Sequence, residues 1–382
     1  MSNLFEIFYR FLLLGLVSFG GPMAHLGYFR NTFVEKLKWL DDATYSKLVA
    51  LSQFLPGPSS SQVGFSIGLK KGGLAGGIAA FIAFTLPSFL ALYFIATLQI
   101  SQSDNQFLIG VITGLKLFAV VVVADAAIGM FKNFCKDNIT RILFGISTLI
   151  LVAFNAVFIQ VIVLISAAIF GMIFLKNTTN NTIQKAKRLK TFPFILFLSL
   201  LFILPFFSAI DENIKIFSVF YESGSLVFGG GHVVLPLLEQ NLGDMVDKES
   251  FLVAYSLAQA VPGPMFTIAS YLGADILNQS PFLGALIATM AIFLPGFLLI
   301  ISFWESFESY TNKPKVLNAV AGVNVAVVGL LAAVLINTVI PSAVYSFLDL
   351  LIVLIGLYIV RKFQIPILYM ILSFIFIGII LT

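Results

Sequence analysis

Residues 18–25 read Ser-Phe-Gly-Gly-Pro-Met-Ala-His, and residues 53–58 read Gln-Phe-Leu-Pro-Gly-Pro. Both signals return later in the chain, as Phe228-Gly229-Gly230-Gly231-His232 and then Gln259-Ala260-Val261-Pro262-Gly263-Pro264. Each time a glycine cluster, a spacer and a Gln-x-x-Pro-Gly-Pro follow one another inside an apolar stretch. Two copies of a module with broken helices are typical of a membrane transporter whose binding site lies where the copies meet.

The composition identifies the class of protein. Of 382 residues, 59% are hydrophobic and 10% are charged, and the mean hydropathy is +1.02. Many windows exceed the roughly 20 apolar residues that a membrane-spanning helix needs. The apolar runs are continuous rather than alternating, which argues against a β-barrel. We therefore predict an all-α polytopic protein of the cytoplasmic membrane.

Several other functional classes lack their signals. The N-terminus shows no short apolar segment followed by a small-residue cleavage site, so no removable signal peptide is expected. Cys135 is the single cysteine and no metal-ligand cluster is present, which argues against a disulfide or a metal site. No Walker loop, dinucleotide-binding glycine pattern or haem motif occurs. We expect no cofactor, no enzymatic activity and no nucleic-acid partner.

Charged residues orient the expected spans. The loop 176–191 is rich in Lys and Arg and has no acid, so the positive-inside rule makes it cytoplasmic. Counting from this loop places Lys70 and Lys71 inside, and Asp104 and Asp211 outside. Continuous spans are expected at 73–97, 106–131, 141–157, 158–175, 192–208, 281–304, 317–340, 344–360 and 364–382.

The motif regions 1–71 and 213–279 do not fit simple spans. Basic residues on both sides of 48–69 predict a re-entrant hairpin with its tip at Pro56-Gly57-Pro58, and 4–36 reads as a second hairpin, broken at Gly20-Gly21-Pro22. In the second copy 239–250 is acidic, which favours entry from the opposite face. We expect an inverted repeat, each module having two broken hairpins and about four spans. The predicted domains are 1–175, a linker with one span at 176–212, and 213–382.

The glycine-proline breaks are the expected anion site. A helix N-terminus exposes unpaired N–H groups and carries partial positive charge, so it binds anions without a formal cation. Pro22, Pro58 and Pro264 each follow a glycine, and proline is favoured at the first position of a helix. Hydroxyl groups of Ser59, Ser60, Ser61 and Thr267 follow the tips and can donate to the same anion. The alternative is that Pro-Gly-Pro only kinks a spanning helix.

Polar side chains accompany both breaks. His25 lies three residues after Pro22, and His232 directly follows the glycine triplet; each is a candidate for anion contact or proton coupling, or simply a buried histidine bonded to a carbonyl. Gln53 and Gln259 lie one helical turn before the tips, where their amides can cap open carbonyls or donate to a ligand. Gln62 is a weaker candidate.

Lys116 is predicted in the middle of a span, where a cation is expensive and a functional role is the default hypothesis. Its alternative is a structural ion pair with Glu222 as the candidate partner. The set of candidate substrate-binding residues is Ser18, Gly20, Gly21, Pro22, His25, Gln53, Gly57, Pro58, Ser59, Ser60, Gln62, Lys116, Gly229, Gly230, Gly231, His232, Gln259, Gly263, Pro264 and Thr267.

At these residues the chain resembles the chromate ion transporter family in its duplicated, two-domain form. The resemblance rests on Ser18 through Arg30, Phe54 through Gln62, Phe228 through Leu238 and Ala258 through Ala274. It implies efflux of chromate driven by an ion gradient, chromate resistance, and sulfate as a competing look-alike. The positions that it implicates are Gly20, Gly21, Pro22 and His25; Pro56, Gly57, Pro58, Ser60 and Gln62; Gly229 to His232; and Pro262 to Pro264.

The sequence therefore predicts a secondary transporter for a tetrahedral oxyanion, with chromate first. The expected partners are that oxyanion and membrane lipid, with a proton or counter-anion as the candidate coupling ion and a homodimer as the candidate assembly. The alternatives are a sulfate transporter of the same fold, a passive anion channel and a membrane enzyme; the absence of a clustered acid–base or metal set argues against the last.

Overall fold

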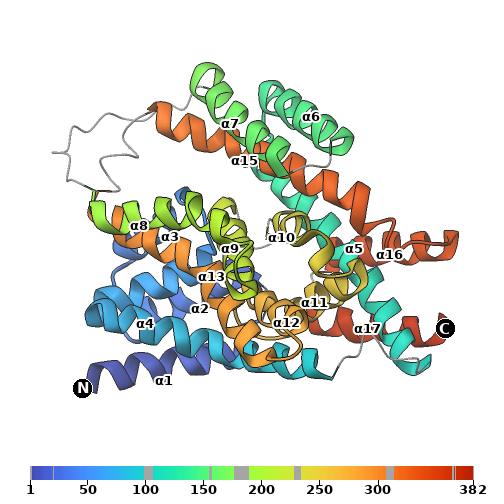
Figure 1. The fold of residues 1–382 in the computed structure, drawn as a ribbon, viewed down its shortest axis with the longest axis horizontal. Helices are drawn as coiled ribbons and strands as arrows, with labels where there is room; N and C mark the ends of the chain where they lie inside the picture. Colours follow the sequence, from blue (N-terminus) through green and yellow to red (C-terminus); the bar gives the residue numbers. More distant parts are fainter. Residues whose placement is uncertain are drawn as a thin grey trace.

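The computed structural model describes residues 2–19, 21–98, 106–154, 157–175, 189–227, 234–306, 314–363, 365 and 367–381, and within them the chain is helical without a β-strand (Figure 1). The first copy contributes α1 (Ser2–Val17), α2 (Gly21–Phe29), the π-helix η1 (Arg30–Lys36), α3 (Asp42–Phe54), α4 (Ser59–Thr97), α5 (Gln106–Phe134), α6 (Asn138–Ala153) and α7 (Val157–Phe174).

The second copy follows a short connection formed by α8 (Thr191–Phe202) and the 3-10 helix η3 (Leu204–Phe207). It contributes α9 (Glu212–Leu226), α10 (Val234–Leu242), the 3-10 helix η5 (Gly243–Met245), α11 (Lys248–Ala260), the 3-10 helix η6 (Met265–Thr267), α12 (Ile268–Ile276), α13 (Pro281–Phe303), α15 (Pro314–Val334), the π-helix η7 (Leu335–Val339), α16 (Phe347–Phe363) and α17 (Ile367–Leu381).

The helices confirm the predicted class of multi-pass membrane protein. Among the described residues, those long and apolar enough to cross a membrane are Ser59–Thr97, Gln106–Phe134, Pro281–Phe303 and Pro314–Val339. The expected span 192–208 is wrong in its length, because α8 ends at Phe202 and Pro205, which lacks an N–H, lies in the 3-10 helix that follows. The 12 residues of α8 rise about 18 Å. That is shorter than the roughly 30 Å hydrocarbon core of a bilayer.

The two Pro-Gly-Pro hairpins form at the predicted places, and the first leg of each begins at an equivalent N-cap. Asp41 and Asp247 hold equivalent N-cap positions, where their carboxylates accept from the backbone N–H of Thr44 and Ser250. The hydrogen bond from Thr44 lowers the pKa of Asp41. In α4, the expected re-entrant leg and span are joined through a kink at Gly72 and Gly73, where Gly73 has a φ of 62°.

The two copies run in opposite directions where they meet. The second half of α4 and its counterpart α13 are antiparallel: Phe81 contacts Phe293 and Phe297 at ring-centroid distances of 5.1 and 4.8 Å, whereas the later residue Phe89 contacts the earlier Phe282 at 6.0 Å. Equivalent helices that pack antiparallel are the geometry of an inverted repeat.

Helices are exchanged between the copies in the outer part of the bundle. α5 of the first copy packs on α17 of the second, and its counterpart α15 packs on α7 of the first. Both contacts need glycine: a Cβ on Gly114 would lie 2.1 Å from the Phe374 carbonyl oxygen, and one on Gly322 would lie 2.1 Å from the Ala167 carbonyl oxygen. Small residues of this kind let membrane helices approach closely.

The remaining helices form a second group around the breaks. α1 packs on α4, α9 packs on α13, and α12 bridges α4 and α13. In Figure 1 this group fills the lower left and centre, while α6, α7 and α15 lie above it. Most of the broken hairpins thus belong to one packed group, and the exchanged helices α5–α7 and α15–α17 form the other. α11 of the second hairpin packs on α5 and so joins the two groups.

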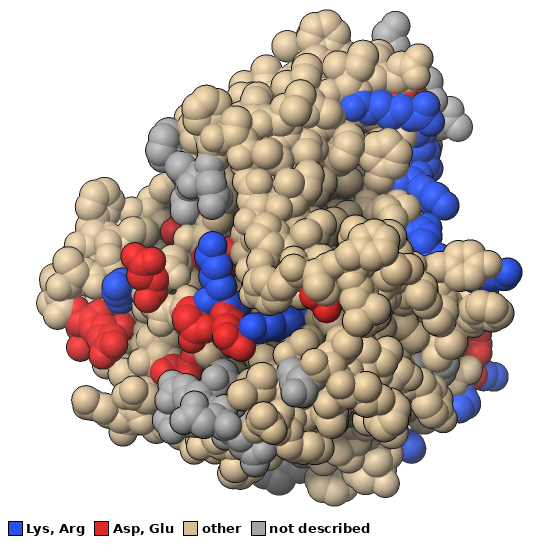
Figure 2. Space-filling view, turned by 90° about the vertical axis from the view of Figure 1, so that its right-hand side faces the viewer, with Lys and Arg blue, Asp and Glu red and all other residues tan. Residues whose placement is uncertain are grey.

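Charged side chains collect at the two ends of the described bundle. Lys38, Trp39, Asp41 and Lys70 line one hollow, and the Lys71 ammonium lies 4.9 Å from the Trp39 ring, so both basic segments of the first copy meet there. A second hollow is lined by Asp211, Glu212 and Lys215 with Met245. Figure 2 shows acidic side chains gathered with a few basic ones at the left and centre of the view, and basic side chains along the right-hand edge.

Candidate functional site

The Pro-Gly-Pro tip of each copy is hydrogen-bonded to the glycine break of the other. The Gly57 N–H donates to the Val227 carbonyl oxygen at 2.7 Å, and the Gly263 N–H donates to the Ser18 carbonyl oxygen at 2.9 Å. Val227 and Ser18 are equivalent, since each precedes a Phe-Gly-Gly. The reciprocal pair of bonds brings each tip against the residue that precedes the glycine break of the other copy.

Each tip also rests on a proline-bearing helix of the opposite copy. Gly57 has a φ of 126°, and a Cβ there would lie 2.9 Å from the Gly296 Cα. Gly263 has a φ of 111°, and a Cβ there would lie 2.7 Å from the Ser88 hydroxyl oxygen. Both the backbone conformation and the close approach exclude a side chain, so glycine is required at both tips.

His25 connects the first break to the first tip. Its side chain is fully buried; Nε2 lies 3.2 Å from the Ser18 carbonyl oxygen, and Nδ1 lies 3.3 Å from the Ser60 hydroxyl oxygen. A carbonyl oxygen only accepts, so Nε2 carries the hydrogen and, in the neutral ring, Nδ1 accepts from the Ser60 hydroxyl. Three predicted site residues therefore form one chain of hydrogen bonds.

Gln62 caps the opened backbone at the tip, a role that the sequence suggested for Gln53 and Gln259. Its Nε2 donates to the carbonyl oxygens of Pro56 and Gly296, at 2.9 and 3.2 Å. These two acceptors fix the orientation of the amide and leave Oε1 buried without a hydrogen-bond partner. Gln62 thus spans the interface between the copies.

The N-terminus of α4 keeps donors for a ligand. The first N–H bonded within the helix is that of Gln62, to the Pro58 carbonyl oxygen at 2.9 Å. The N–H groups of Ser59, Ser60 and Ser61 precede it and have no acceptor within the helix. The Ser61 and Ser18 hydroxyls are buried without a hydrogen-bond partner. Buried polar groups of this kind require a hydrogen-bond partner.

The expected anion donors need one correction. The N–H groups of Gly57 and Gly263 are engaged by carbonyl oxygens of the opposite copy, so they are not free for an anion. Pro58 and Pro264 also lie at N-cap positions rather than at the first helical residue. The unpaired donors at the start of α4 are therefore the N–H groups of the three serines after Pro58 and the Ser61 hydroxyl.

The second tip is arranged differently from the first. Thr267 is fully buried, but its hydroxyl donates to the Pro264 carbonyl oxygen at 2.6 Å. Gln259 is buried and its Nε2 lies 2.9 Å from the Met265 sulfur, whereas the equivalent Gln53 is exposed. Gly21 and Pro22 open α2 as predicted. Gly20, Gly229, Gly230, Gly231 and His232 lie outside the described residues.

Lys116 does not pair with Glu222, the partner expected from the sequence. Its ammonium lies 2.8 Å from the Glu249 carboxylate at the start of α11, and the Lys116 side chain is 13% exposed. The expectation failed because the span containing Lys116 and the acidic segment before the second tip meet only through tertiary packing. Lys116 therefore joins α5 to α11.

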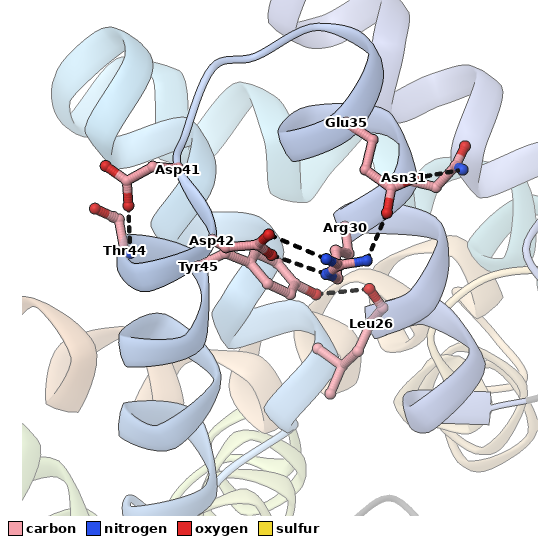
Figure 3. Close-up of polar contacts among 8 residues, drawn as sticks. All are labelled: Leu26, Arg30, Asn31, Glu35, Asp41, Asp42, Thr44 and Tyr45. Atoms are coloured by element: carbon pink, nitrogen blue, oxygen red, sulfur yellow. Dashed lines mark hydrogen bonds and ion pairs between the residues drawn. The ribbon is translucent and has the colours of Figure 1, made fainter.

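A polar cluster ties the two hairpins of the first copy at their basic end (Figure 3). The Arg30 guanidinium donates to both Asp42 carboxylate oxygens at 2.9 and 3.0 Å and also to Glu35. Its hydrogen bonds with Asp42 and the nearby carboxylate charges raise the pKa of Arg30. The Tyr45 hydroxyl donates to the Leu26 carbonyl oxygen at 2.6 Å. The helix that carries His25 is thus held against α3.

Sequence reasoning missed the residues on which the tips rest, Ser88 and Gly296. Their signal was present: each follows a proline inside a span, in the repeated Leu-Pro-x-Phe of the two copies. The Ser18 carbonyl oxygen accepts from Gly263 and His25. Nothing in the sequence signalled this role, because every residue has a backbone carbonyl.

Comparisons with known proteins agree with this architecture. The family model described as Chromate transporter matches residues 5–172 and 214–379. The probable chromate transport protein of Synechococcus elongatus is 28% identical over 338 residues, which cover 85% of this chain and 82% of that protein. The chromate transport protein of Pseudomonas aeruginosa is 24% identical over 343 residues, 87% of this chain and 80% of that protein.

An uncharacterized transporter of Methanocaldococcus jannaschii is 28% identical over 345 residues, which cover 87% of this chain and 83% of that protein. No solved structure matches the chain.

Proposed function

Because the chain belongs to the chromate transporter family, we propose that it is a secondary active transporter that exports chromate across the cytoplasmic membrane and confers chromate resistance. The family is one of transporters rather than enzymes. The substrate is a tetrahedral dianion, and it binds between the two copies at the N-terminus of α4, beside His25, Ser60 and Gln62.

One observation carries this proposal: each tip is bonded to the opposite break, Gly57 to Val227 and Gly263 to Ser18. The bonds make one central unit from segments that are far apart in the chain. Around it lie the buried donors that a dianion needs, namely the free N–H groups of α4 and the unpartnered hydroxyls of Ser18 and Ser61.

Transport follows from movement of this unit against its surroundings. Apart from α11, which packs on α5, the broken hairpins pack with α1, α4, α9, α12 and α13, whereas α5–α7 and α15–α17 pack mainly with one another. Rocking of one group against the other exposes a central site alternately to each side, as in other transporters built from inverted repeats.

Sulfate is the second candidate substrate, because helix N-termini and hydroxyls recognise the shape and charge shared by tetrahedral dianions. The test is radiolabelled chromate flux in proteoliposomes with an imposed pH gradient or membrane potential. We expect chromate to accumulate above its external concentration, with excess sulfate as a competitor. Flux that only equilibrates chromate across the membrane would mean that the protein is a channel. Accumulation of sulfate but not of chromate would mean that sulfate is the substrate.

A further inference from the structure

The first legs of the two Pro-Gly-Pro hairpins differ in burial. Counting back from the tips makes Ser46, Ala50 and Gln53 of α3 equivalent to Leu252, Ser256 and Gln259 of α11, and the N-caps Asp41 and Asp247 confirm this register. The three residues of α11 are buried, whereas the three residues of α3 are exposed. They follow one another at helical spacing, so the same face is covered in one copy and open in the other.

The covered face of α11 lies against α5. The Ser256 hydroxyl donates to the Leu115 carbonyl oxygen at 2.7 Å. One residue further along α5, the Lys116 ammonium forms its ion pair with Glu249 at 2.8 Å. The counterparts α3 and α15 are not packed against one another in this way.

The ion pair has no counterpart in the other half of the molecule. Gly114-Leu115-Lys116 of α5 corresponds to Gly322-Val323-Asn324 of α15, so Lys116 is equivalent to Asn324. Counting back from the tips makes Glu249 equivalent to Ala43. Asparagine and alanine cannot form an ion pair. The contact of α11 with α5 therefore has a latch that a contact of α3 with α15 would lack.

The open face of α3 is polar, since Ser46, Lys47 and Gln53 lie on it. Polar groups at membrane depth occur where they line water-filled cavities rather than lipid. α3 begins beside Lys38 and Lys70, at the end of the molecule that the positive-inside rule assigns to the cytoplasm. The exposed face of α3 therefore starts at the end of the molecule assigned to the cytoplasm.

We propose that the structure is the cytoplasm-facing state of the transport cycle, in which the α3 face formed by Ser46, Lys47, Ala50 and Gln53 lines the entry path of the anion. On the other side α11 closes the outer path, held by the Lys116–Glu249 pair. In the outward-facing state the copies exchange these arrangements: α3 packs on α15, and α11 leaves α5. This inference rests on the proposed function for the alternating-access cycle and for the identity of the anion.

A matched pair of cysteines tests the asymmetry. In a Cys135→Ser background, Ala50→Cys and Ser256→Cys place thiols at equivalent positions, and an impermeant thiol reagent is applied to right-side-out and inside-out vesicles. We expect Ala50→Cys to react from the cytoplasmic side alone and Ser256→Cys to be protected on both sides. Equal labelling of the two thiols, or an Ala50→Cys thiol that is inaccessible from the cytoplasm, overturns the proposal.

The latch is tested in the Ser256→Cys protein. Lys116→Gln and, separately, Glu249→Gln should each raise its labelling from outside about tenfold, as expected for loss of a partly buried ion pair. Glu305→Gln is the control, because it removes the exposed pair with Lys190, whose atoms lie 3.2 Å apart. Unchanged labelling in both latch variants would refute the latch.

A separate experiment tests whether the solute on this path is a tetrahedral dianion. Molybdate, a tetrahedral dianion that does not oxidise thiols as chromate does, is added before the reagent, and we expect it to slow labelling of Ala50→Cys. If the sidedness holds without this protection, the α3 face is an open path for a different solute. That result would contradict the proposed function and leave the asymmetry intact.

Discussion

At the scale of single residues, the site is built from hydrogen bonds that a neutral histidine organises. His25 holds the carbonyl of one break and the hydroxyl of Ser60 at once. The Ser60 hydrogen is then committed to His25 while its lone pairs remain free. An anion that arrives must turn this hydroxyl, so Ser60 contributes one neutral hydrogen bond at most.

We therefore expect Ser60→Ala to weaken oxyanion binding about fivefold, since one neutral hydrogen bond contributes on the order of 1 kcal/mol. Equilibrium titration of the purified protein measures the change. Complete loss of binding would show that Ser60 does more than donate one bond, and an unchanged affinity would remove it from the site.

His25→Ala has a different expected effect, on stability. It leaves the buried Ser60 hydroxyl without its acceptor and removes one of the two donors to the Ser18 carbonyl oxygen. An unsatisfied buried polar group costs about 1–3 kcal/mol. The midpoint of thermal unfolding in detergent should fall more for His25→Ala than for Ser60→Ala. The opposite order would contradict the assigned hydrogen bonds.

At the scale of elements, the sequence predicted the breaks well and their contacts poorly. Glycine and proline fix where a helix can begin and end, so the tip at Gly57 and the kinked start of α2 fall where expected. The partner of a side chain depends on packing between distant segments. The pairing of Lys116 with Glu249, and the capping by Gln62 in place of Gln53, needed the structure for that reason.

The tips give a prediction with a matched control. Gly57→Ala forces a positive φ on a residue with a side chain, which costs on the order of 1–3 kcal/mol, and its Cβ would meet Gly296. Gly145→Ala on α6 meets nothing within 4 Å and gains up to about 1 kcal/mol of helix propensity. Chromate flux should be lost in the first variant and normal in the second. Normal flux in both would show that the tip tolerates a side chain.

At the scale of the whole molecule, duplication with inversion places equivalent breaks face to face. The antiparallel packing of α4 and α13 and the exchange of α5 and α15 between copies follow from that symmetry.

The side of the membrane on which each end of the molecule lies is assigned from the distribution of charged residues alone. In a Cys135→Ser background, Asp244→Cys should react with an impermeant reagent from outside and Lys38→Cys from inside. Reaction of both from one side would refute the inverted insertion.

The central claim is that the two copies share one oxyanion site. The most direct measurement is the stoichiometry of chromate binding to the purified chain and to its tip variants Gly57→Ala and Gly263→Ala, each checked for folding by its elution profile and circular dichroism. A shared site predicts one anion per chain, with binding abolished by a change at either folded tip. Two anions per chain, or half of the capacity retained in each single-tip variant, would mean that each copy has a site of its own.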